Sequence, residues 1–281
     1  MQPRTRIKLL FLLPAAAWVL VWTIFPFFYG LWLSLFHIDF GGEDRFIGLG
    51  NFKRFFSDRN ALNAVKITFL FVLGSVTVQV ILGLLLALAA NRPLPLRGLV
   101  RTMLILPLFA TPVAVGFLFF TIFYEEGGLV NGLLRIKVPW LSSPGYALIA
   151  IIIADTWQWI SFCFLVLLAG LQSIPDDVYE AAALETRNRW KIFWHITFPY
   201  LQPTLVLVIL LRITEAFKVF AIPYTLTRGG PGNATLVLPM YAYRAGMRFF
   251  DFGYASAISF MAFVLVMLFI IFLFRSIRQA Y

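Results

Sequence analysis

The chain has 281 residues, of which 61% are hydrophobic and only 13% are charged, and its formal net charge is +10. Because about a quarter of the residues in an average soluble domain are charged, this composition excludes an ordinary soluble fold. No basic stretch is interleaved with stacking aromatic residues in a soluble module, which argues against nucleic-acid binding. We attribute the positive charge to loops that face the cytoplasm and to contact with anionic membrane lipid.

Apolar segments long enough to cross a hydrocarbon core, which takes about 20 helical residues, recur along the chain. The six segments are residues 9–36, 67–90, 103–124, 147–171, 201–220 and 255–274. Lipid-exposed backbone must be hydrogen-bonded within its own segment, so open strands are excluded. We therefore predict an all-α, polytopic membrane protein in which residues 1–281 form a single transmembrane domain of six helices.

The first segment also has the beginnings of a secretory signal peptide. Arg4, Arg6 and Lys8 precede an apolar run, and the alanines at 15–17 resemble a cleavage site. However, the apolar character continues to Phe36, far beyond the apolar core of a signal peptide. The sequence therefore predicts an uncleaved first span.

Lysine and arginine are distributed unevenly between the connecting segments. They dominate the N-terminus and the C-terminus, and they recur in the connections 91–102 and 172–200. Residues 37–62 and 125–145 instead mix acidic and basic side chains. Since short cytoplasmic loops carry the excess of lysine and arginine, we predict that both termini and the 172–200 connection lie in the cytoplasm.

The sequence offers little for bond chemistry. Cys163 is the only cysteine, so an intrachain disulfide is impossible, and His37 and His195 lack the spacing of metal ligands. The glycine-rich stretch 229–232 lacks the lysine and the strand–helix context of a phosphate-binding loop. We therefore expect no metal site, no cofactor in this chain and no enzymatic activity of its own.

The 172–200 connection is too long for a structureless loop and has the residues of helices. Ser173 can cap a first helix, with Asp176 three residues later, and Pro175 suits a first helical turn. Ala181 and Ala182 share a face with Val178 and Glu185, and the alanines keep that face flat enough for another backbone to approach closely.

A second short helix follows in the same connection. Asn188 can cap it, and Trp190, Phe193 and Trp194 share a face suited to the membrane interface. We expect Pro199 to end this helix before the fifth span begins. The connection therefore reads as a helix–turn–helix against the cytoplasmic membrane surface.

The stretch EAAALETRNRWKIFWHITFP (180–199) resembles the signature of integral-membrane permeases of binding-protein-dependent ABC importers, of the carbohydrate, maltose-permease-like type. That signature is Glu-Ala-Ala, three residues, Gly, nine residues, then Ile-x-Leu-Pro. Here Thr186 stands at the Gly position and Phe198 at the Leu position, with the spacing intact. The resemblance spans nearly the whole chain, because further stretches agree: GLGNF (48–52), RTMLILPLFATPVAVGFLF (101–119), AGLQSIPDDVYEAA (169–182), LTRGGPGNAT (226–235) and FDFGYASA (250–257).

The resemblance implies the type I ABC importer permease fold in a bacterial or archaeal inner membrane. It also implies that the 172–200 loop docks in a cleft of a cytosolic ATPase dimer, which binds ATP and Mg²⁺. A second homologous permease and an extracytoplasmic solute-binding protein would complete the importer. The residues implied in coupling to the ATPase are Glu180, Ala181, Ala182, Thr186, Ile196 and Pro199.

Thr186 is the departure with a physical consequence. Glycine adopts a left-handed turn at little cost, and a β-branched threonine does not. Either the first helix continues one residue further, or Asn188, which tolerates such a conformation better, takes the bend.

Ionisable and polar groups within spans are candidates for the substrate pathway. Asp155, Gln158 and Phe162 share a face of the fourth span, and Arg212, Glu215 and Lys218 are spaced three apart on the fifth. The expected pathway also includes the stacking residues Trp157, Phe217, Phe220 and Tyr224. The alternative for the charged set is an intrahelical ladder that neutralises itself at a subunit interface or near the outer surface.

Two substrate and mechanism alternatives stay open at this point. Members of this family often have Asp where Ala221 stands and Gly where Arg228 stands, so an anionic sugar or polyol derivative is an alternative to a neutral carbohydrate. Six spans are also half of a larger inverted-repeat carrier, so half of a secondary transporter is the competing mechanism.

Overall fold

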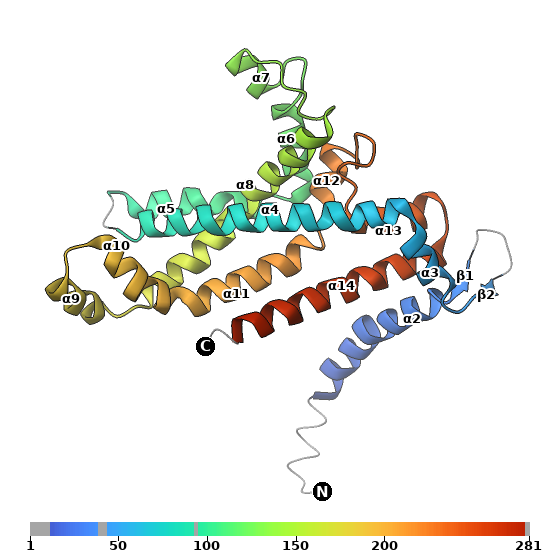
Figure 1. Cartoon of the computed structure of the whole chain (residues 1–281), viewed down its shortest axis with the longest axis horizontal. Coiled ribbons are helices and arrows are strands. Elements are labelled where there is room, and N and C mark those ends of the chain that lie inside the picture. Colours follow the sequence, from blue (N-terminus) through green and yellow to red (C-terminus); the bar gives the residue numbers. More distant parts are fainter. Residues whose placement is uncertain (1–11, 39–43, 93–94, 279–281) are drawn as a thin grey trace, which may run out of the picture. The chain divides into compact units, whose positions relative to one another are not determined.

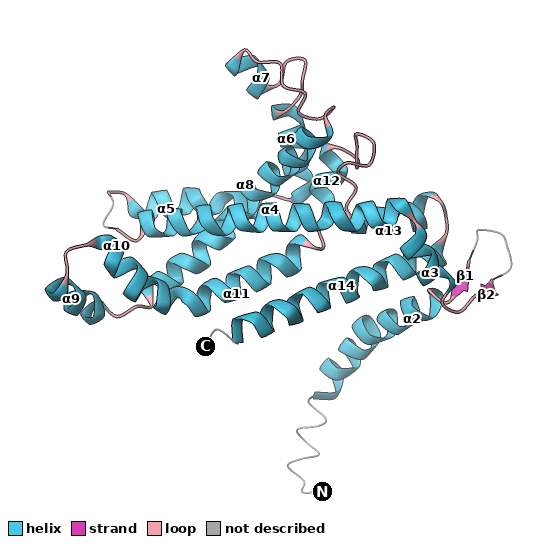
Figure 2. Cartoon of the chain, viewed as in Figure 1, coloured by secondary structure: helices cyan, strands magenta, loops and turns pink. Residues whose placement is uncertain are grey.

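The computed structural model describes residues 12–38, 44–92 and 95–278. The predictions for Arg4, Arg6, Lys8 and the start of the first span lie outside these residues. The described chain is almost entirely helical (Figure 2), with one short antiparallel pair in which Phe36 lies opposite Phe46. The all-α membrane fold is therefore confirmed. The chain divides into two compact units, residues 1–63 with 238–281 and residues 64–237, and each is described by itself.

The first unit contains the elements at both ends of the chain (Figure 1). In chain order these are η1 (Leu20–Ile24), α2 (Phe25–Leu33), β1 (Phe36–His37), β2 (Arg45–Phe46), α3 (Gly50–Ser57), α13 (Leu238–Tyr243), η4 (Arg244–Arg248) and α14 (Phe252–Arg278). The helix α4 (Arg59–Ala90) begins in this unit and continues into the second.

The second unit holds the remaining helices. They are α5 (Arg97–Ile105), η2 (Leu106–Phe109), α6 (Pro112–Ile122), α7 (Leu129–Leu134), α8 (Pro144–Gln172), α9 (Asp176–Glu185), α10 (Arg189–Ile192), η3 (Phe193–Thr197), α11 (Phe198–Ala216) and α12 (Ala221–Leu226). In Figure 1, α9 and α10 lie at the end of this unit where α8 ends and α11 begins.

Among the described residues, five helical stretches are long and apolar enough to cross a membrane. They are Leu12–Leu33, Arg59–Ala90, Pro144–Gln172, Arg189–Ala216 and Phe252–Arg275. The segment predicted as a span at 103–124 is not one straight helix, because Arg97–Phe109 and Pro112–Ile122 meet at 99°. Ala110 and Thr111 are extended between them, as expected just before a proline, whose ring disfavours helical backbone at the preceding residue.

Two glycines let the spans of the second unit pack closely. A Cβ on Gly83 of α4 would lie 2.6 Å from the Cβ of Cys163 on α8, and one on Gly170 of α8 would lie 2.8 Å from Thr204 on α11. Small residues are typical where membrane helices approach each other, since lipid itself provides no hydrophobic drive for association. These contacts make α4, α8 and α11 the core of the unit, with the side chain of Cys163 fully buried.

The first unit is held by its own polar cluster, the Asp58 cluster, which consists of Arg54, Asp58, Tyr241, Asp251 and Tyr254. The Asp58 carboxylate accepts hydrogen bonds from the hydroxyls of Tyr241 and Tyr254. Arg54 forms an ion pair of 2.6 Å with Asp251, and its guanidinium lies 3.9 Å above the Tyr254 ring. The cluster therefore ties α3 and the start of α4 to α13 and α14.

The pKa values in this cluster follow from its contacts. Burial acts to raise the pKa of Asp58, but the hydrogen bonds from Tyr241, Tyr254 and the backbone N–H groups of Asn60 and Ala61 outweigh it and lower that pKa below its ordinary value. Burial and the hydrogen bond to Asp58 raise the pKa of Tyr241 to about 12. The cluster is therefore in its bonded state, with a charged Asp58 and neutral Tyr241, at neutral pH.

A neighbouring contact explains two of the sequence stretches singled out above. The Asn51 side chain, in GLGNF, donates to the backbone carbonyls of Ser34 and Phe36 at 2.9 and 2.8 Å. Gly253, in FDFGYASA, packs against the same Phe36 carbonyl so closely that a Cβ there would overlap it. Both stretches therefore fix the turn that follows α2.

Candidate translocation pocket and coupling loop

A pocket of about 270 Å³ lies in the second unit. Its lining comes from the start of α6, from α8, from the end of α11 and from α12: Pro112, Asp155, Gln158, Trp159, Arg212, Glu215, Lys218, Val219, Phe220, Ala221 and Ile222. Six residues predicted for the substrate pathway line it together, namely Asp155, Gln158, Arg212, Glu215, Lys218 and Phe220.

Beside this pocket lies a buried network, the Asp155 cluster, formed by Gln79, Asp155, Trp159 and Arg212. Asp155 and Arg212 are 2% and 1% exposed and form an ion pair of 3.3 Å. Gln79 bridges them, because its amide donates to Asp155 at 2.7 Å and accepts from Arg212 Nε at 2.8 Å. The guanidinium of Arg212 lies 4.2 Å from the centre of the Trp159 ring. The ion pair joins α8 to α11 and has no net charge, and Gln79 connects it to α4.

Gln79 and Trp159 were missed by the sequence prediction. Gln79 is the one amide in the apolar run 67–90. A strongly polar side chain within a span is a signal of function, so this residue could have been found from the sequence. Trp159 directly follows Gln158 and has no sequence feature that separates it from Trp157.

Two polar atoms at the pocket have no partner in the described structure. They are Arg212 Nη1 and Gln158 Oε1, both buried. The Gln158 amide nitrogen is occupied, since it donates at 2.6 Å to the carbonyl of Ala110 at the bend before α6. Arg212 Nη1 is a donor and Gln158 Oε1 is an acceptor, and both lie beneath the surface of the lining. Leaving such atoms unpaired costs about 1–3 kcal/mol each, so a polar ligand group that reached either atom would be stabilised.

The charged residues of the fifth span do not form one ladder. Glu215 and Lys218 form an exposed i,i+3 ion pair of 2.6 Å, as the ladder alternative expects. Arg212 does not join it, because its partner Asp155 is on α8. The ladder was predicted from spacing along one helix, but the Arg212 side chain is buried in the interior of the unit and pairs with another helix.

Four of the predicted aromatic residues do not line the pocket. Trp157 is 38% exposed and meets Phe119 at a centroid distance of 5.8 Å, and Phe162 lies 6.2 Å from Trp159. Phe217 packs edge-on against Phe69, and Tyr224 stacks on Phe220 at 5.1 Å. The aromatic surfaces at the pocket itself are Trp159 and Phe220.

The predicted helix–turn–helix of the 172–200 connection is present with different boundaries. Its first helix, α9, has Pro175 at its N-cap, and Ser173 instead donates its hydroxyl to the Gly170 carbonyl at the end of α8. The Ser173 cap was therefore wrong, because that hydroxyl closes the preceding helix. On α9, Glu180 and Ala181 are exposed, whereas Ala182 is buried.

Thr186 follows neither of the two expected conformations. The helix ends at Glu185, and Thr186 has φ −154° and ψ 139°, an extended backbone that suits a β-branched residue. The Asn188 cap is confirmed, since its side chain accepts from the Trp190 N–H at 3.0 Å. Asn188 itself has φ −78°, so neither residue needs the left-handed region.

Pro199 does not end a helix, contrary to expectation. The helical stretch continues from Arg189 to Ala216, and Ile196 lies in its π-turn, η3. In this turn the N–H of Phe198 donates to Phe193, five residues earlier. The wider turn directly before Pro199 relieves the clash of the proline ring with the preceding turn, so the helix passes through. The second half of the loop and the fifth span thus form one continuous helical rod, Arg189–Ala216.

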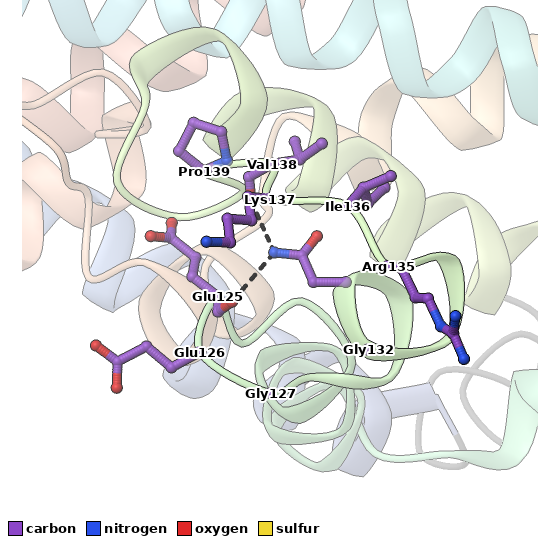
Figure 3. A pocket seen from close by; sticks show the side chains of 10 residues that line it. Glu125, Glu126, Gly127, Gly132, Arg135, Ile136, Lys137, Val138 and Pro139 are labelled. Carbon is purple, nitrogen blue, oxygen red and sulfur yellow. Dashed lines mark hydrogen bonds between the residues drawn. The ribbon is translucent and has the colours of Figure 1, made fainter.

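A further pocket, of about 590 Å³, lies in the 125–139 segment and involves none of the predicted pathway residues. Figure 3 shows the side chains that line this pocket. The Asn131 amide donates to the carbonyls of Glu125 and Val138, at 3.2 and 3.0 Å. Burial acts to raise the pKa of Glu125, but hydrogen bonds from the backbone N–H groups of Leu141 and Ser142 and from the Ser142 hydroxyl together outweigh it and lower that pKa. The segment is therefore a loop folded on its own polar groups.

Comparison with known proteins identifies the family of this chain. Residues 79–280 match the family described as "Binding-protein-dependent transport system inner membrane component". The trehalose/maltose transport system permease protein MalF of Thermococcus litoralis is 40% identical over 93% of this chain and 90% of its own length. The sulfoquinovosyl glycerol transport system permease protein SmoG of Agrobacterium fabrum is 35% identical over 93% of this chain and 87% of its own.

A solved structure agrees in fold. The solved structure is a bacterial alginate ABC transporter in complex with an alginate pentasaccharide-bound periplasmic protein. One of its chains superposes on this one with a TM-score of 0.87 at 24% identity, and the match covers 99% of this chain and 96% of that chain. The chain therefore belongs to the inner-membrane components of binding-protein-dependent transport systems, and it is a multi-pass permease of a carbohydrate ABC importer in the cell membrane.

Proposed function

We propose that this permease passes a carbohydrate or polyol through the pocket between α8, α11 and α12, after delivery by an extracytoplasmic solute-binding protein. The permease is not itself an enzyme, since the ATPase activity of such importers is in a separate subunit. We assign ATP and Mg²⁺ binding to that subunit. We further propose a heterodimer with a second homologous permease and a cytoplasmic location for both termini.

The observation that carries the pathway is the pair of open atoms, Arg212 Nη1 and Gln158 Oε1. A small shift of the lining would let sugar hydroxyls accept from the first atom or donate to the second, and the Trp159 and Phe220 rings offer apolar surfaces to a sugar ring. At about 270 Å³ the pocket is at the small end of ligand sites, which suits one sugar ring at a time.

The charges favour a neutral substrate. Arg212 is paired with Asp155 and Lys218 with Glu215, so the lining carries two positive and two negative charges. An anionic derivative is the second candidate, because Ala221 stands in the lining where an acid is often found in the family. Relatives of comparable identity are named for a neutral disaccharide and for a sulfonated glycoside, so similarity alone does not choose.

The substrate class is tested by ATP-driven uptake in proteoliposomes that contain the complete importer. A neutral sugar and its phosphate or sulfonate analogue are offered in parallel. We expect the neutral compound to be taken up and the anionic one to be excluded. Uptake of only the anionic compound would refute the neutral assignment.

For coupling, we propose that α9 docks on the ATPase and that Glu180 contacts a basic group there. Glu180 and Ala181 are exposed on α9, as a docking face requires. The Tyr179 hydroxyl lies 3.2 Å from that of Thr197, which links α9 to the rod that begins at Arg189. A displacement of α9 is therefore passed directly to the fifth span.

The coupling proposal is tested with Glu180→Ala, and Glu185→Ala is the matched control because it removes the same charge from the same helix. We expect Glu180→Ala to lose co-purification of the ATPase and ATP-driven uptake, and the control to keep both. Uptake that needs neither ATP nor a binding protein would instead support a secondary transporter.

A further inference from the structure

A larger pocket, of about 1080 Å³, lies beside the coupling loop. Its lining joins the last turn of α4, the end of α8, the start of α9 and the α10–η3 segment. It shares no residue with the proposed translocation pocket. It is therefore a separate cavity of the second unit.

The pocket lies at the level where two spans end. Leu88 is two residues from the end of α4 and Leu171 is one residue from the end of α8, and both line the cavity. Arg101 reaches the end of α4, because it donates to the Ala90 carbonyl at 2.9 Å. The ends of apolar spans mark the level at which hydrocarbon meets lipid headgroups.

The charges of the lining suit a single anion. Arg92 and Arg189 line the pocket from separate elements, and both are exposed. Asp176 is the acid of the lining, so these side chains leave a net charge of +1. A phosphodiester carries one negative charge, and guanidinium groups bind phosphate oxygens bidentately.

Apolar and aromatic side chains complete the surroundings. The floor includes Leu88, Leu171 and Phe193, which a free inorganic anion would not need. Trp190 on the rim is 73% exposed and Trp194 is 54% exposed, and tryptophan is enriched at the headgroup level of membranes. Charge and apolar surface together match a lipid rather than a soluble phosphate.

We infer that this pocket binds an anionic phospholipid, with the phosphate between Arg92 and Arg189 and the first acyl segments along the apolar floor. The lipid then connects the end of α4 to the α10 rod. If the loop couples to the ATPase as proposed above, such a lipid stiffens that coupling. The lipid site itself does not depend on that role.

The test counts bound lipid rather than transport. The complete importer is placed in nanodiscs of phosphatidylcholine with increasing phosphatidylglycerol, and retained phosphatidylglycerol is measured by native mass spectrometry. The variant is Arg92→Gln with Arg189→Gln. The matched control, Arg97→Gln with Arg187→Gln, removes the same charge from exposed residues outside the lining.

We expect the pocket variant to lose one tightly held phosphatidylglycerol, with roughly a 10- to 30-fold weaker apparent affinity, at about 1 kcal/mol for each basic residue. The control should retain it. Equal losses in both variants would reduce the effect to general surface charge and overturn the site. Displacement of the lipid by millimolar glycerol 1-phosphate would also overturn it, because headgroup chemistry alone would then suffice.

Absence of carbohydrate uptake by the wild-type importer, with the lipid still bound, would refute the proposed function and leave the lipid site standing. Thermal unfolding of each variant checks that it is folded. The single variants Arg92→Gln and Arg189→Gln should each show an intermediate loss of lipid, which tests the site without the double substitution.

Discussion

The Asp58 cluster and the Asp155 cluster are built from the same kinds of side chain and differ in what they leave open. Each combines a carboxylate, an arginine and an aromatic ring that faces the guanidinium. Among the described residues, no side-chain atom of the Asp58 cluster is buried without a partner, whereas Arg212 Nη1 in the Asp155 cluster is. The Asp58 cluster is therefore internally satisfied, whereas the Asp155 cluster beside the pocket retains an unpaired donor.

Their surroundings sharpen the contrast. Arg54 is half exposed, so its ion pair with Asp251 is partly screened by solvent. Arg212 and Asp155 are almost fully buried, so each depends on the other for charge compensation. Loss of one partner alone is therefore expected to cost less in the exposed Arg54–Asp251 pair than in the buried Arg212–Asp155 pair.

The largest expected effect comes from breaking the buried pair. Asp155→Leu leaves the Arg212 charge uncompensated, which we expect to destabilise the protein by about 3–5 kcal/mol. The double variant Asp155→Leu with Arg212→Leu should recover much of this loss, because it removes both charges, and should still lose uptake. Thermal unfolding in detergent and uptake in proteoliposomes measure the two effects. A single variant no less stable than the double one would show that the pair is not coupled.

A smaller effect is expected in the closed cluster. Asp58→Asn removes the charge that accepts two tyrosine hydroxyls, which should cost about 1–3 kcal/mol at neutral pH without changing substrate selection. Because the pKa of Asp58 is lowered in the folded state, its contribution is fully present above its ordinary pKa of 3.8 and is lost as the pH falls through the lowered value.

The unfolding midpoints of wild type and Asp58→Asn should therefore differ steadily from pH 7 to about pH 4 and converge below it. The exposed Asp44 provides the control, since Asp44→Asn should match wild type throughout. A difference that grows as the pH falls would contradict the assignment.

The smallest effect is expected at Thr186. Its extended backbone is open to glycine, so Thr186→Gly should leave transport near normal and cost about 0.5–1 kcal/mol in backbone entropy. Thr186→Pro should be much worse, because the Thr186 N–H donates to the Ala182 carbonyl and φ is −154°. Assembly with the ATPase and uptake measure both. Complete loss of assembly in the glycine variant would contradict this account of the turn.

The sequence predicted the features that depend on local composition. Apolar length gave the helical membrane fold, and the capping preference of Asn188 gave the start of α10. The bend of 99° and the passage of the helix through Pro199 were not predicted, because a proline can either break or merely widen a helix. Tertiary packing decides between these outcomes.

The candidate site was predicted only in part, for a related reason. Asp155 and Arg212 attracted attention as charges in apolar spans, but their pairing joins residues 57 positions apart. Gln79 is more distant still from Arg212, at 133 positions, and no local pattern connects them. Side-chain type marks the participants, whereas only the packing of α4, α8 and α11 determines their partners.

The central claim is that Arg212 Nη1 and Gln158 Oε1 contact the transported carbohydrate, and Gln158→Met tests it most directly. Methionine has a similar volume and lacks both the acceptor and the amide donor that bonds the Ala110 carbonyl. The readout is sugar transported per ATP hydrolysed by the reconstituted importer. We predict a several-fold fall in this ratio, with ATPase activity and assembly close to wild type and a loss of about 1 kcal/mol in stability from the missing Ala110 bond. An unchanged ratio for the neutral sugar would contradict the claim.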